Sequence, residues 1–104
     1  MTETNQEKIS REELNLETAQ IAWKELQRFF ASGAALFVSA ELDLVEVAVQ
    51  MSKDNAEQIR EWMNSGKMVK VTDAQAAAWF EADALLWAVV VRPWVLVQPV
   101  EKLH

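Results

Sequence analysis

The chain has 104 residues, of which 51% are hydrophobic and 25% charged, and its net charge is −6 at pH 7. This length suits one domain whose apolar residues form a core without metal or disulfide support. The sequence contains no Cys, which excludes disulfides, thiolate zinc sites and a cysteine nucleophile. The negative charge argues against nucleic-acid binding, which relies on Lys and Arg at the phosphates.

The N-terminal residues predict a flexible tail on a cytoplasmic protein. Residues 1–13 are mostly polar, and we expect a single globular α+β domain over residues 14–100. The first residues lack the basic and apolar segments of a secretion signal. The most apolar stretch, residues 84–97, contains Arg92 and Pro93 and is shorter than the ~20 residues of a membrane-spanning helix. We therefore expect no membrane partner.

The first helix is predicted over residues 16–31. Its apolar residues recur at helical spacing, and Ser32 and Gly33 follow as a stop signal. The predicted apolar stripe consists of Leu16, Ala19, Ala22, Trp23, Leu26, Phe29 and Phe30. Ile21 falls outside this stripe, so it is a candidate contact with a second molecule.

Two strands are predicted next, over residues 36–38 and 45–51. In the second segment apolar and other residues alternate, with Val45, Val47, Val49 and Met51 on one side. A helix over residues 42–52 is the alternative. We favour the strand because apolar residues would surround such a helix almost completely.

Local signals define the second half of the chain. Residues 54–57 form a capping box before a helix that stops at Gly66, and residues 72–75 open another helix that ends near Ala82. Strands are predicted over residues 68–71, 85–91 and 94–97, the last two joined by a turn or a kink at Arg92 and Pro93. The predicted fold is therefore α+β, with three helices packed on a small mixed or antiparallel sheet in the order α-β-β-α-β-α-β-β.

Most of the chain, residues 14–99, resembles a small bacterial family of uncharacterised proteins, a domain of unknown function. The similarity rests on four segments, NLET (15–18), WKELQRFFA (23–31), LDLVEVA (42–48) and PWVLVQ (93–98). The resemblance implies a standalone bacterial cytoplasmic protein, and it assigns no activity and no catalytic residue.

Catalytic motifs are not visible in the sequence. The single histidine is the last residue, His104, where the chain end cannot hold it against a reacting atom. Gly33 and Gly66 stand alone rather than in a phosphate-binding loop. We therefore predict no catalytic residue, no metal ligand and no cofactor, and we favour a protein that is not an enzyme.

Five tryptophans are the most unusual feature of the composition. Arg92 and Trp94 project to the same side if their strand is continuous, and both residue types dominate the energetics of protein interfaces. Together with Ile21 they form the predicted interface. A speculative ligand pocket is built from Trp87, Asp83 and Glu46.

Two functional hypotheses follow from these residues. The leading one is a non-enzymatic binding or self-association module, whose partner is a second copy of the chain or an unidentified protein. The alternative is a small-molecule-binding protein or a cofactor-free enzyme with a pocket of Trp, Arg and carboxylate side chains.

Overall fold

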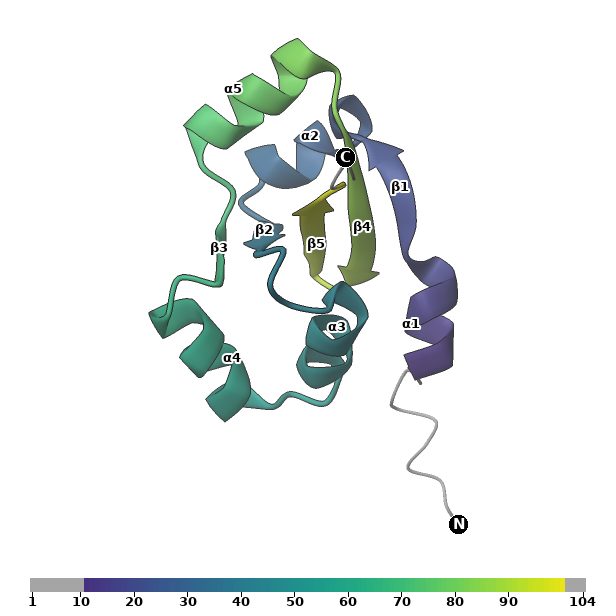
Figure 1. Ribbon diagram of the computed structural model, residues 1–104, viewed down its shortest axis with the longest axis vertical. Coiled ribbons are helices and arrows are strands. Elements are labelled where there is room, and N and C mark those ends of the chain that lie inside the picture. The colour runs from purple at the N-terminus through teal and green to yellow at the C-terminus, as the bar shows by residue number, and fades with distance from the viewer. Residues whose placement is uncertain (1–10, 101–104) are drawn as a thin grey trace.

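The computed structural model describes residues 11–100 as five helices and five strands. Residues 1–10 of the predicted tail, and His104, lie outside the described residues. The elements in chain order (Figure 1) are α1 (Arg11–Glu17), β1 (Ala19–Ala22), α2 (Trp23–Ala31), β2 (Ala35–Val38), α3 (Leu44–Ser52), α4 (Ala56–Asn64), β3 (Met68–Lys70), α5 (Asp73–Ala82), β4 (Leu85–Val91) and β5 (Trp94–Pro99).

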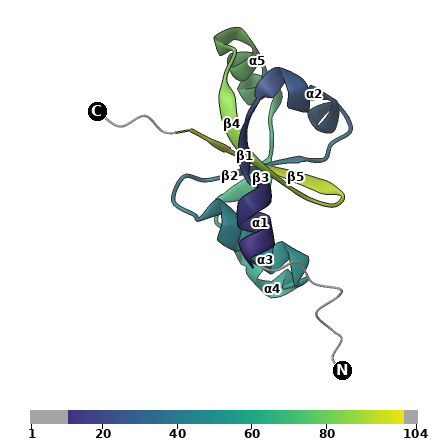
Figure 2. The ribbon, with the colours of Figure 1, turned by 90° about the vertical axis from the view of Figure 1, so that its right-hand side faces the viewer.

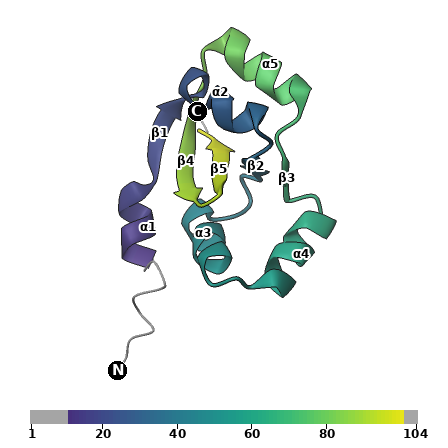
Figure 3. The same cartoon turned by 180° about the vertical axis from the view of Figure 1, so that it is seen from behind.

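The five strands form one mixed sheet in the order β1-β4-β5-β2-β3. The β4–β5 hairpin lies at its centre, with Val89 opposite Leu96, and β2 runs parallel to β5. The outer strands β1 and β3 pair antiparallel with β4 and β2. Seen from behind, β1 and β3 mark the two edges of the sheet (Figure 3).

Helices cover both faces of this sheet. One face, called here the α3 face, lies under α1, α3 and α4 and buries Leu14, Leu36, Val47, Val89 and Leu96. The other, the α2 face, lies under α2 and α5 and buries Trp23, Leu26, Ala76, Leu86 and Val95. In Figure 2 the two groups of helices lie above and below the strands. Alternate residues of each inner strand therefore enter different cores, as the period of a strand requires.

The helices cover only half of each face, at opposite ends. Along β4, Val89 and Val91 are buried on the α3 face, whereas Leu85 and Trp87 on that same face are 52% and 36% exposed. On the α2 face the exposure is reversed, because Leu86 and Ala88 are buried while Val90, near the hairpin turn, is 42% exposed. Each face of the sheet thus has a covered half and an open half.

The predicted strand over residues 45–51 is wrong, because this segment is the helix α3. Asp43 is its N-cap, and Leu44, Val47, Ala48 and Val49 are all buried. The helix is apolar on most sides because it packs against the sheet, α1 and α4 at once, which is the situation of an internal helix. This helix alone overturns the predicted order of elements.

The single helix predicted over residues 16–31 is also wrong, because β1 interrupts it. In a strand Ile21 turns towards the core of the α2 face and β1 pairs with β4, while Leu16, assigned to the core stripe, is left 82% exposed. Strand pairing and burial of Ile21 outweigh the helical pattern. The observed order is α-β-α-β-α-α-β-α-β-β, and five helices rather than three surround the sheet.

The elements after residue 55 agree with the sequence signals. Asn55 caps α4, Gly66 follows it with φ +79°, and Thr72 opens α5 with a capping box to Gln75. Arg92 and Pro93 form the turn of an antiparallel hairpin rather than a kink.

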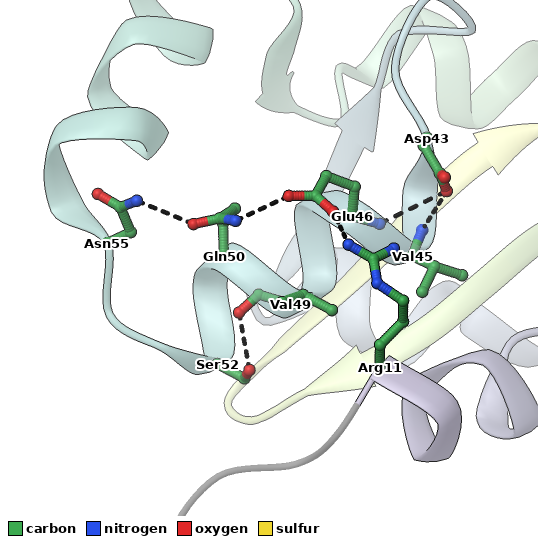
Figure 4. Close-up of polar contacts among 8 residues, drawn as sticks. All are labelled: Arg11, Asp43, Val45, Glu46, Val49, Gln50, Ser52 and Asn55. Carbon is green, nitrogen blue, oxygen red and sulfur yellow. Dashed lines mark hydrogen bonds and ion pairs between the residues drawn. The ribbon is translucent and has the colours of Figure 1, made fainter.

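A chain of polar contacts ties α1 to α3 and α4 (Figure 4). Arg11 donates to Glu46, Gln50 donates to the same carboxylate at 2.7 Å, and Asn55 donates to Gln50 at 2.8 Å. These contacts run along the exposed side of α3 while Leu14, fully buried, anchors α1 from below. Hydrophobic burial supplies the attachment of α1, and the polar chain fixes its orientation.

Replacing Asp43 tests the start of α3. Its carboxylate accepts hydrogen bonds from the backbone N–H of Val45 at 3.0 Å and of Glu46 at 3.5 Å. We expect Asp43→Ala to lower the free energy of unfolding by about 1 kcal/mol, the usual cost of losing an N-cap, and Asp43→Asn to retain most of the stability. Urea denaturation measures both. Equal stability of the Ala and Asn variants would contradict the cap.

The pH dependence of stability tests the contact of Glu46. Its pKa is lowered, first by the hydrogen bond from Gln50 and then by Arg11. The stabilisation that the Glu46 carboxylate provides is complete above the pKa of a Glu side chain in the unfolded chain, about 4.3. It is lost as the pH falls through the lower pKa of Glu46 in the folded state. At about pH 7 we expect Glu46→Gln to lower the free energy of unfolding by up to about 1 kcal/mol. The effect is no larger because the side chains of Glu46 and Arg11 are partly exposed.

The difference should shrink as the pH falls below about 4.3, and it should vanish once the pH lies below the pKa of Glu46 in the folded state, where the carboxylate is protonated in both states. Glu61→Gln, an exposed change on α4 outside the polar chain, is the control and should match the wild type at every pH. A deficit of Glu46→Gln that persists at low pH would show that its contact is not electrostatic.

Candidate functional site

One candidate site is a hollow of about 460 Å³ between α4 and the turn of the β4–β5 hairpin, called here the hairpin groove. One wall is α4, another is the end of α3 with the link to α4, and the third is the turn itself. Its lining residues are Met51, Asp54, Ala56, Ile59, Arg60, Met63, Val91, Arg92, Pro93 and Trp94. The interior is therefore apolar and aromatic, with charge at the rim.

The tertiary fold brings two arginines from different elements to the lining of this groove. Arg60 comes from α4 and Arg92 from the hairpin turn, and both are exposed. Neither is part of an ion pair within residues 11–100, whereas Arg11, Lys24 and Lys67 each pair with a carboxylate. The groove thus combines two unpaired guanidinium groups with a half-buried Trp94 on a chain whose net charge is −6.

A second hollow of about 560 Å³ adjoins the hairpin groove. It shares Met51, Asp54, Val91 and Arg92 with the groove and extends past Val90. Arg92 therefore lines both hollows, which together follow the hairpin turn. Such a surface has room for an extended segment of chain.

A third hollow, of about 430 Å³, lies between α1 and the start of α3. Within residues 11–100, its cation is Arg11, which Glu46 already engages. The other charged side chains that these described residues supply are the carboxylates of Glu12 and Asp43, so they add no free positive charge. We therefore place the candidate site in the hairpin groove.

The three residues of the predicted interface fall on two surfaces. Arg92 and Trp94 lie together in the hairpin groove. Ile21 lies apart from them in the edge strand β1, where its half-buried side chain packs on the core of the α2 face.

The speculative pocket residues have separate partners. Glu46 binds Arg11 and Gln50 on α3, and Asp83 ends α5 and pairs with Lys24 at 3.6 Å. Trp87 lies on the open half of the α3 face, opposite Gln20 and Gln98 in the neighbouring strands. A Trp, an Arg and a carboxylate do share one hollow, but the members are Trp94, Arg92 and Asp54.

Sequence reasoning missed the contribution of α4 to the groove. Ile59 and Met63 of α4 line the groove, and Met63 is 44% exposed. The available signal was Arg60, a cation beside these apolar residues, but its proximity to Arg92 depends on how α4 docks. Asp54 has a positive φ of 60°, which turns the chain sharply between α3 and α4 and shapes the groove wall.

Within residues 11–100, no three Asp, Glu or His side chains gather as metal ligands would. No helix in that same range is long and apolar enough to cross a bilayer.

Comparisons with known proteins agree with the resemblance seen in the sequence. Residues 9–99 match the family described as "Protein of unknown function (DUF2288)". No curated protein matches the chain. The NMR solution structure of PA1075 from Pseudomonas aeruginosa is similar over 100% of both chains, with 42% identity and a TM-score of 0.79. Because the family match spans most of its length, the chain belongs to this family of proteins of unknown function.

Proposed function

We propose that this protein is a non-enzymatic bacterial binding module that docks a segment of another protein in the hairpin groove. The observation that carries the proposal is that Arg60 and Arg92, neither of which has an ion pair among residues 11–100, line one largely apolar hollow from α4 and from the hairpin turn. The relative from Pseudomonas aeruginosa supports a bacterial setting. The Cys-free composition is the support for placing the protein in the cytoplasm.

The chemistry of the groove selects an acidic, amphipathic partner. Guanidinium groups bind carboxylates through paired hydrogen bonds, and a carboxylate between Arg60 and Arg92 would contact both walls. Trp94 offers a rigid apolar surface, while Met51 and Met63 adapt to side chains of different shape. The expected segment therefore carries Asp or Glu beside a large apolar side chain.

The net charge of the chain makes this site selective. A protein with a charge of −6 repels acidic partners over most of its surface, so the groove is where such a partner is tolerated. Charge complementarity of this kind contributes to specificity and association rate more than to affinity. The apolar floor must then supply most of the binding energy.

A small molecule is the second candidate ligand. The volume of about 460 Å³ falls in the range of small-ligand pockets, and Trp94, Arg92 and Asp54 line it. We favour a protein segment because the adjoining hollow extends the groove past Arg92.

Affinity capture with paired variants tests the proposal. The wild type, Arg60→Glu/Arg92→Glu and the control Arg28→Glu/Lys70→Glu are immobilised and exposed to lysate of the native bacterium. The two double variants change the charge equally, and the control residues are exposed and lie outside the groove. We expect a partner that the wild type and the control retain and that the groove variant loses by about tenfold or more.

Two outcomes would contradict this function. All three proteins retaining the same partners would show that the groove is not their docking site. Native mass spectrometry of the purified protein that detects a stoichiometric small molecule, released by the groove variant, would replace the protein segment with the second candidate.

A further inference from the structure

The two edge strands of the sheet differ in whether charged residues discourage pairing with a further strand. Lys67 precedes β3 and Lys70 ends it, and lysines at an edge discourage pairing with another strand. The other edge, β1, consists of Ala19, Gln20, Ile21 and Ala22, without a charge, a proline or a glycine. The β3 edge is thus guarded, and the β1 edge is open.

The backbone of β1 presents hydrogen-bonding groups along this open edge. The N–H of Trp23 donates to the carbonyl of Ala84 at 2.9 Å, so odd-numbered residues here bond towards β4. Because successive residues of a strand direct their amide groups to opposite sides, the N–H and C=O of Gln20 point outward. Antiparallel pairing with another strand would satisfy them.

Exposed apolar side chains border the same edge. Leu16 on α1 is 82% exposed, and it lies about 200° around the helix axis from the buried Leu14, so it points away from the core. Trp87, 36% exposed, is the register partner of Gln20 in β4. A strand added to β1 would lie next to Gln20, and its side chains would extend the face on which Trp87 is exposed.

We propose that a second copy of this chain pairs with β1, antiparallel, across a two-fold axis at Gln20. The two sheets then continue as one, and Gln20 of each copy faces Gln20 of the other. An amide side chain both donates and accepts hydrogen bonds, so this residue is complementary to itself. A closed dimer of this kind is the commonest symmetric assembly, and it leaves no further open β1 edge.

Charge complementarity also favours a second copy. Glu17 lies two residues before β1, and Lys24 lies two residues after it. Antiparallel pairing brings Glu17 of one copy to the end of the interface where the partner's α2 begins at Trp23, next to Lys24. Lys24 pairs with Asp83 at 3.6 Å in the single chain, but both side chains of that pair are exposed, so Lys24 can also meet the exposed Glu17 of a second copy. The symmetric contact repeats this opposition of charges on the other side of the axis.

A charge swap at Gln20 tests the proposal by light scattering. We expect the wild type to have twice the mass of one chain, and Gln20→Glu or Gln20→Lys alone to weaken the dimer by at least about tenfold, because like charges then meet at the axis. Mixing the two variants should restore the doubled mass. The control Gln58→Lys, the same change on α4 away from β1, should remain dimeric.

Because Gln20 is exposed, its variants should keep the fold, which circular dichroism checks. A wild type that remains monomeric in concentrated solution would overturn the proposal. Dimers that survive both Gln20 variants, or a mixture of the variants that fails to reassociate, would also overturn pairing through β1.

Discussion

The structure depends on a sheet whose inner strands are apolar on both faces. In β5, Val95 and Val97 enter the core of the α2 face, while Leu96 enters the core of the α3 face. Neither face can be left to solvent without losing the stabilisation of buried apolar area, roughly 25 cal/mol per Å². One short chain must therefore form two layers of helices, one on each face of the sheet.

Short helices meet this requirement only in part. None of the five described helices exceeds ten residues, so each layer covers half of its face. The covered halves lie at opposite ends of the sheet, which leaves two open regions. One lies near the hairpin turn, where Val90 is exposed beside Arg92 and lines the hollow that adjoins the hairpin groove. The other surrounds Leu85 and Trp87, next to the open edge of β1.

Local signals in the sequence were sufficient wherever a cap, a glycine or a turn fixed the element by itself. Thr72 with Gln75, and Gly66, define α5 and the end of α4 in this way. Residues 45–51 were wrongly predicted as a strand because their β-branched side chains fit a strand equally well. Only the contacts of α3 with the sheet and two other helices explain its apolar surface. The Asp43 cap was the one local signal for this helix.

The candidate site was partly predictable for the same reason. Arg92 and Trp94 are close in the chain, and a hairpin keeps them together. Arg60 joins them only through the docking of α4, which no local pattern encodes. Likewise β1 was not predicted, because the strand has only four residues and two of them are Ala. Its pairing with β4 also depends on residues more than 60 positions away in the chain.

Amide hydrogen exchange measured by NMR tests most directly whether the inner strands hold the two layers together. We expect the amides of Val89 and Leu96 to be among the slowest and to exchange only when the whole domain unfolds, because both side chains are buried within paired strands. The amide of Lys70, which points away from β2 at the guarded edge, should exchange far faster. Exchange at Val89 and Leu96 as rapid as at Lys70 would contradict a structure that depends on this two-faced sheet.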